Sequence, residues 1–317
     1  MNDKKTTELE KYIEKYKYEK MFDGEHINSQ KFPECIVLKK HQVGDIFYDY
    51  HHHDIYEILY IVSGKVLYGI ENKKYVLETG DLVLISPSIL HKLLEVIENP
   101  CERMIITFPE RYIKKFCTER TDLLKVFKLM NTSHFYKVSF NNIYKKRFEE
   151  ILQILINTLF VDEYGTDVIF DSAFVQMMVL INKEYIQTKP TYQDYTSENK
   201  IVTLASQYIM MHLHEKIIID DIAKYVNLSA SRLQHIFKIE TGISMVKYIN
   251  KKRLIHSKEL LRNGQNVIEI YQRCGFQDYT SFFRAFKKEY DLTPKTYQQQ
   301  YKEFIKTQIS KKRENKE

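Results

Sequence analysis

The last third of the chain contains the same residue pattern twice. The segment from Phe237 to Tyr248 recurs forty-nine positions later, from Phe286 to Tyr297. Each copy follows an acidic helix start, a short turn and a second helix, which is the layout of a helix-turn-helix unit. Two such units in tandem predict an all-α domain that binds double-stranded DNA.

The first unit begins at Asp220, turns through Asn227 and restarts at Ser229, whose hydroxyl can cap a new helix. We predict that helix over 230–240, with Gly242 as the left-handed residue that ends it. Apolar residues recur at spacings of three and four, which leaves a polar outer face. We expect this face to read DNA bases through Ser231, Arg232, Gln234, His235 and Lys238.

The second unit repeats this plan. Asn266 and Glu269 resemble a capping box, and Asp278 can cap a helix predicted over 279–290. Its expected reading face consists of Thr280, Ser281, Phe283, Arg284 and Lys287. The run 244–262 contains no Gly or Pro, so one helix of about 28 Å should join the units. That separation suits two reading helices in successive major grooves, which lie about 34 Å apart.

The charge of this part of the chain also favours DNA. Residues 200–317 contain 22 Lys and Arg against 12 Asp and Glu, whereas the whole chain carries a net charge of +6. Basic side chains on phosphates supply affinity, and side chains on base edges supply sequence choice. Arg232 and Arg284 can each form a bidentate pair with guanine, and Gln234 with adenine. An all-helical protein-binding domain, with the repeat as a folding device only, is the alternative.

On these motifs, the segment 199–301 resembles the DNA-binding domain of the AraC/XylS family of bacterial transcription regulators. Ile218, Tyr271 and Asp291 depart from the capping residue, the small residue and the glycine usual at these positions. The resemblance implies a cytoplasmic, sequence-specific regulator that acts as a homodimer, with one DNA half-site for each domain. RNA polymerase is a further expected partner, although contacts with it leave no readable spacing.

The first half of the chain has a β pattern. Short runs rich in Ile, Val, Leu and Tyr are separated by turn residues at Ser63-Gly64, Glu71-Asn72 and Thr79-Gly80, which predicts an antiparallel barrel or sandwich. The expected fold class is therefore α+β and multidomain. The predicted parts are an N-terminal arm (1–31), a barrel (32–110), a helical dimerisation segment (111–187), a linker (188–198), the tandem helix-turn-helix domain (199–301) and a basic tail (302–317).

Within this region, His51, His53 and Glu57, followed by His91, resemble the motifs of the cupin barrel, a jelly roll. Strand alternation places His51 and His53 on one face, and all four side chains could form a metal site. A metal-dependent cupin enzyme fused to a DNA-binding module is therefore one alternative.

AraC-type sensor domains are expected to keep these cupin positions without a catalytic metal. We therefore expect no cofactor and no enzyme activity, and we assign the motif to the binding of a small-molecule effector. The expected contacts are His51, His53, Glu57, His91, Tyr48 and Tyr60, with Tyr56 and Tyr68 as further aromatic walls. A regulator without an effector, whose barrel is filled by its own side chains, is the other alternative.

Two helical segments follow the barrel. The second is apolar over more than one face, with a stripe that Val175, Val179 and Leu180 extend: Phe170, Phe174, Met177, Met178, Ile181 and Tyr185. Such a helix needs two partners. We expect these to be its own sensor domain and the same helix of a second subunit, while burial wholly within one chain remains the alternative.

The chain shows no sign of secretion or membrane insertion. Cys35, Cys101, Cys117 and Cys274 are scattered without metal or redox spacing, which suits a reducing compartment. No apolar run is long enough to span a membrane. We therefore expect a cytoplasmic protein without a membrane partner.

Overall fold

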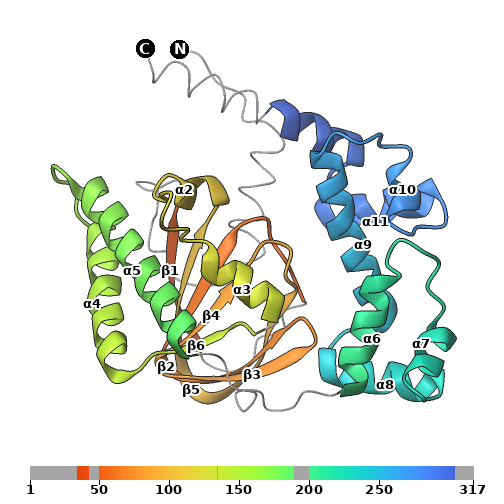
Figure 1. Cartoon of the computed structure of the whole chain (residues 1–317), viewed down its shortest axis with the longest axis horizontal. Helices are drawn as coiled ribbons and strands as arrows, with labels where there is room; N and C mark the ends of the chain where they lie inside the picture. Colours follow the sequence, from red (N-terminus) through yellow and green to blue (C-terminus); the bar gives the residue numbers. More distant parts are fainter. Residues whose placement is uncertain (1–33, 43–49, 134, 189–199, 304–317) are drawn as a thin grey trace. The chain divides into compact units, whose positions relative to one another are not determined.

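The computed structural model describes residues 34–42, 50–133, 135–188 and 200–303. The chain divides into two compact units, one formed by Asp23–Glu198 and one that contains Asn199–Glu317 (Figure 1). The first unit combines an antiparallel sheet with helices and the second is helical, which confirms the predicted fold class. The predicted arm and nearly all of the predicted linker and tail lie outside the described residues.

Within the described residues, the first unit is built on a six-stranded antiparallel sheet in the order β1-β5-β2-β4-β6, with β3 paired to β2. β2 and β5 form its centre and pair along most of their length. The strands are β1 (Ile36–Gln42), β2 (Tyr56–Ile70), β3 (Lys73–Glu78), β4 (Asp81–Ile85), β5 (His91–Phe108) and β6 (Lys137–Ser139).

One predicted turn is wrong. β2 continues through Ser63 and Gly64, with register shifts against β5 that are typical of β-bulges. Gly64 has a φ of +88°, and a Cβ there would lie 2.9 Å from the carbonyl oxygen of Pro100. The glycine thus permits a close approach of β5 rather than a chain reversal. The predicted turns at Glu71-Asn72 and Thr79-Gly80 are confirmed.

The helices of the first unit follow the sheet. They are α2 (Glu110–Lys114), α3 (Lys125–Ser133), α4 (Asn142–Thr158) and α5 (Thr166–Thr188). The predicted α5 stripe is buried, and α4 packs alongside α5 (Figure 1). One partner of α5 is therefore α4 of the same chain. Val168, Ile169 and Ile186 of α5 remain exposed, and the expected contact of this helix with a second subunit stays a prediction.

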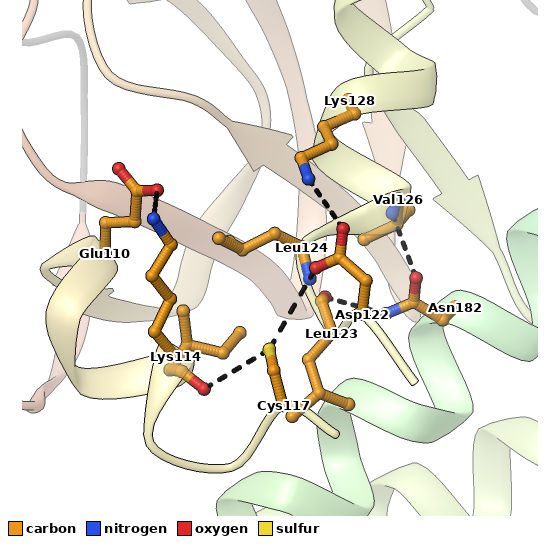
Figure 2. Close-up of polar contacts among 10 residues, drawn as sticks. Glu110, Lys114, Cys117, Asp122, Leu123, Leu124, Val126, Lys128 and Asn182 are labelled. Atoms are coloured by element: carbon orange, nitrogen blue, oxygen red, sulfur yellow. Dashed lines mark hydrogen bonds and ion pairs between the residues drawn. The ribbon is translucent and has the colours of Figure 1, made fainter. Parts of the chain in front are cut away.

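A buried asparagine connects α3 to α5 (Figure 2). The Oδ1 atom of Asn182 accepts a hydrogen bond from the backbone N–H of Val126 at 2.9 Å. Its Nδ2 group donates to the carbonyl oxygens of Leu123, at 3.0 Å, and Met178, at 2.8 Å. One side chain thus satisfies three buried backbone groups and fixes the start of α3 on α5.

The second unit contains α6 (Lys200–Met211), α7 (Ile219–Tyr225), α8 (Ala230–Thr241), α9 (Met245–Arg262), α10 (Ile270–Arg273) and α11 (Tyr279–Tyr290). The predicted long connecting helix is confirmed as α9, which begins where Ser244 accepts a hydrogen bond from the backbone N–H of Lys247. Its 18 residues span about 27 Å. None of the described helices is both long enough and apolar enough to cross a bilayer.

The helix α9 binds the two helix-turn-helix units together. Arg253 on α9 donates from Nε to the carbonyl oxygen of Leu213 at 3.1 Å and from Nη2 to that of Glu215 at 2.6 Å. Lys251, also on α9, pairs with Glu289 of α11. The ring of Tyr248 on α9 also lies 5.4 Å from that of Phe237 on α8. Since α9 contacts both α8 and α11, it fixes the position of one helix-turn-helix unit against the other.

Candidate functional site

The first candidate reading helix is α8. Ser229 accepts a hydrogen bond from the backbone N–H of Arg232 at 3.3 Å, and Gly242 ends the helix with a φ of +76°. Leu233 and Phe237 are buried. The five predicted reading residues are all exposed: Ser231, Arg232, Gln234, His235 and Lys238. The apolar spacing thus fixes which face of α8 is available to a ligand.

The second candidate reading helix is α11. Asp278 accepts a hydrogen bond from the backbone N–H of Ser281 at 2.7 Å, and this bond lowers the pKa of the Asp278 carboxyl. Asp291 ends the helix in the left-handed conformation with a φ of +54°, which aspartate can adopt at modest cost. Four of the predicted residues are exposed and Phe283 is half-buried: Thr280, Ser281, Arg284 and Lys287.

A shallow concave surface lies on α11. It has a volume of about 310 Å³ and is lined by Phe283, Arg284, Lys287, Lys288 and Asp291. Three cations around an aromatic ring suit a phosphate or a base edge. The sequence analysis did not predict Lys288 as a reading residue, because it falls outside the outer stripe of the helix. Its place beside Lys287 was a usable signal.

The start of the second helix-turn-helix unit differs from the predicted capping box. Asn266 accepts from the backbone N–H of Ile268 at 3.1 Å, and its side-chain amide donates to Glu269 at 2.9 Å. A capping box would instead bring the Glu269 carboxylate to the backbone N–H of Asn266. Tyr271 is half-buried and its ring lies 6.3 Å from that of Tyr279, so its bulk packs beside α11.

A second candidate site lies in the sheet domain. Glu57 on β2 is 1% exposed and His91 at the start of β5 is 0% exposed. The Oε2 atom of Glu57 lies 3.1 Å from Nε2 of His53 and 4.0 Å from Nε2 of His91. His51 pairs with His91 in an isolated β-bridge, and their ring centroids lie 4.2 Å apart. The structure therefore brings together the four predicted residues of the cupin-like motif.

The ionisable groups of this cluster change one another's pKa. Burial raises the pKa of Glu57, but the hydrogen bond to His53 and the charges of His91, His53 and His51 bring it down to about 2. Burial and the neighbouring His51 hold the pKa of His91 well below its usual value. The cluster thus contains an ionised carboxylate beside a neutral imidazole at neutral pH.

The tyrosines predicted beside the motif separate onto two faces. Tyr60 is three residues from Glu57 and lies on the other face of β2, where its hydroxyl donates to Glu149 of α4 at 2.8 Å. Tyr56 contacts Phe127 of α3 on that same face. Tyr68, whose strand register shifts at the bulges, stacks near His91 with ring centroids 6.3 Å apart. Tyr48 lies outside the described residues.

Tyr50 is a member of the same region that the sequence analysis missed. Its side chain is buried, and its hydroxyl has no hydrogen-bond partner among the described residues. A Cβ on Gly69 would lie 2.0 Å from that hydroxyl, so only glycine leaves room for the ring. Its place next to His51 in the sequence was the available signal.

Two family models match the chain. Residues 34–166 match an AraC-like ligand binding domain and residues 222–300 match a helix-turn-helix domain. The HTH-type transcriptional activator RhaR of Mannheimia succiniciproducens is 24% identical over 261 residues, which cover 79% of this chain and 87% of the relative. The activator RhaS of Citrobacter koseri is 24% identical over 253 residues, with coverage of 78% and 87%.

A comparison with solved structures gives a weaker likeness. ToxT from Vibrio cholerae with bound unsaturated fatty acid is 14% identical, with a TM-score of 0.38. The match covers 84% of this chain and 95% of that chain. The two family models, one for each compact unit, are the stronger findings.

Proposed function

Since the chain belongs to the AraC family of DNA-binding transcription regulators, we propose that it activates transcription from a site that it reads through the outer faces of α8 and α11. The observation that carries this proposal is the matched construction of the two helices. Each begins at a side-chain cap, ends at a left-handed residue and exposes the face opposite its buried stripe.

The two arginines are the strongest candidates for base contacts. Arg232 on α8 and Arg284 on α11 are both exposed, and a guanidinium can form two parallel hydrogen bonds with guanine. The contacts of α9 favour simultaneous binding, because this one helix packs against α8 through Tyr248 and Phe237 and pairs with α11 through Lys251 and Glu289. DNA affinity from the surrounding lysines should fall steeply as salt rises.

The test compares binding of the full chain to its selected DNA site and to random DNA, by fluorescence anisotropy at fixed salt. Arg232→Ala and Arg284→Ala should each weaken binding to the selected site by about 1–3 kcal/mol and leave random DNA less affected. Arg273→Ala is the matched control, since Arg273 is an exposed arginine of α10 outside both reading helices. Equal losses on both DNAs would reduce the two arginines to phosphate contacts.

We also propose that the chain acts as a homodimer, but with a contact other than the buried stripe of α5. Exposed apolar side chains gather where α4 ends and α5 begins, around a groove of about 230 Å³ whose lining includes Ile154, Val161, Tyr164 and Ile169. Ile169→Asp should lower the dimer fraction in analytical ultracentrifugation. Ile143→Asp, at the start of α4 and 81% exposed, should leave it unchanged.

The role that we propose for the sheet domain is ligand sensing rather than catalysis. The matched relatives are transcriptional activators, and the family model over this part of the chain is a ligand-binding domain. A ligand can change DNA binding only if it has different affinities for two arrangements of the protein. In a dimer, such a change alters whether both DNA-binding domains can hold neighbouring half-sites at once.

A further inference from the structure

An aromatic side chain interrupts the polar outer face of α11. Phe283 is half-buried, so part of its ring is open to a ligand. It lines the concave surface of this helix together with Arg284, Lys287, Lys288 and Asp291. Side chains four residues apart are neighbours on a helix, so the ring lies next to Lys287 on the face that we propose enters the DNA groove.

Two tyrosines support this ring from behind. The ring of Tyr279, one helical turn earlier, lies 6.0 Å from that of Phe283. The ring of Tyr271 on α10 lies in turn 6.3 Å from that of Tyr279, with its edge toward the other face. Both tyrosines pack against the hydrophobic core of the second helix-turn-helix unit. Aromatic rings attract each other at these distances, so this row of three rings restricts the position of Phe283.

The two helix-turn-helix units differ at the matching positions. With the offset of forty-nine residues, Phe283 corresponds to Gln234 of α8, and Tyr279 corresponds to Ala230. A glutamine can form two hydrogen bonds with adenine, whereas a phenyl ring can make only an apolar contact with a base edge. The two reading helices therefore present different chemistry at equivalent places in the DNA groove.

We propose that Phe283 selects a thymine by contact with its 5-methyl group in the major groove, and that Tyr271 and Tyr279 position the ring for this contact. Thymine is the one DNA base with an apolar group on its major-groove edge. The neighbouring cations of α11 can hold phosphates or base edges on either side of it. The proposal rests on the proposed function, because it names one base of the site that α11 reads.

The row of rings also gives a role to Tyr271. The resemblance to the AraC/XylS family leads to the expectation of a small residue at this position, yet the tyrosine fits beside α11 through Tyr279. We assign it as a positioning residue, because it reaches the DNA only through the two rings in front of it.

The test uses the full chain and a DNA site that it has selected from a random library. Each thymine of this site is replaced in turn by deoxyuridine, which lacks only the methyl group. One of these replacements should weaken binding by about 4-fold, the contribution of one buried methyl group. Phe283→Ala should abolish this difference between thymine and uracil, as a double-mutant cycle requires of two groups in contact.

Tyr271→Ala tests the positioning role. It keeps Phe283 but removes the support of the row, so the preference for thymine over uracil should fall while binding to the uracil-containing site is unchanged. Equal losses on both DNAs would refute this role. Ile268→Ala is the control, since Ile268 is an exposed apolar residue of the second unit outside both reading helices, and it should leave the preference intact.

Photochemical cross-linking tests the contact in the unmodified chain. With 5-iodouracil in place of the identified thymine, the iodine takes the position of the methyl group, and irradiation couples the base to an aromatic side chain that touches it. The cross-linked residue should be Phe283.

Two kinds of failure can be distinguished. A chain that selects no DNA sequence would overturn the proposed function together with this inference. A selected site in which no thymine depends on Phe283, or a cross-link to another residue, would overturn this inference alone.

Discussion

Two glycines of the helical domain allow the effect of backbone strain on stability to be measured separately from the effect of close packing. Gly264 and Gly275 have nearly the same φ, +77° and +79°. A Cβ on Gly264 would meet nothing within 4 Å, whereas one on Gly275 would lie 2.3 Å from the carbonyl oxygen of Leu213. Gly275→Ala and Gly264→Ala therefore share the conformational penalty and differ in the steric one.

The expected losses in the free energy of unfolding follow from these contacts. A left-handed alanine costs about 1–2 kcal/mol, and the reduced freedom of the unfolded chain offsets about 0.4–1 kcal/mol of this. Gly264→Ala should therefore lower the free energy of unfolding by about 1 kcal/mol. Gly275→Ala adds overpacking of about 1–3 kcal/mol and weakens the hydrogen bond from Arg253 to Leu213, so we expect a total loss of about 3 kcal/mol.

Hydrogen–deuterium exchange on the full-length chain is the suitable assay, because peptides from α8 and α11 report the opening of this unit alone. Peptides from β2 and β5 of the other unit provide an internal reference and should exchange at an unchanged rate. Independent sites usually agree within about 0.5 kcal/mol. If the two variants lose the same free energy of unfolding within that scatter, Gly275 is not required for the close approach of its backbone to Leu213, and the reasoning is refuted.

Three further substitutions test other parts of the fold by urea unfolding. Asn182→Ala removes the partner of the Val126 N–H and of two carbonyl groups, so it should lower the free energy of unfolding by about 2–4 kcal/mol; a loss below about 1 kcal/mol would mean that water replaces the amide. Tyr112→Phe deletes the hydrogen bond of 2.6 Å to Asp171 and should cost about 1 kcal/mol, with the same substitution at exposed Tyr164 as the control. Ser229→Ala removes the cap of α8 and should cost about 1 kcal/mol, while Ser229→Asp should restore it; failure of the aspartate to do so would contradict the capping role.

Local sequence signals predicted the helical unit well. The caps at Ser229 and Asp278, the left-handed ends at Gly242 and Asp291, and the connecting helix α9 are all confirmed. These features depend on residues within about one helical turn of each other, so a single stretch of sequence contains the whole of the physical cause. The outer faces of α8 and α11 followed from the same spacing.

Predictions that depended on distant neighbours were less successful. Gly64 resembles a turn residue, but it serves the approach of Pro100 across the sheet. The apolar faces of α5 suggested a second subunit, although α4 already covers one of them. The sequence pattern states that a side chain needs a partner, and it does not state which segment supplies that partner.

The properties of the His/Glu cluster in the sheet domain also divide into those that the sequence predicted and those that it did not. The resemblance to the cupin motif predicted that His51, His53, Glu57 and His91 belong together. The expectation that His51 and His53 share one face of a strand is wrong, because both precede β2, which begins at Tyr56. Only the folded backbone decides that Nδ1 of His53 and Nδ1 of His91 each lie against a backbone carbonyl group, and that both Nε2 atoms lie near the carboxylate of Glu57. The chemistry of the cluster depends on where hydrogens and lone pairs point in space, which is fixed by tertiary contacts and leaves no spacing in the chain.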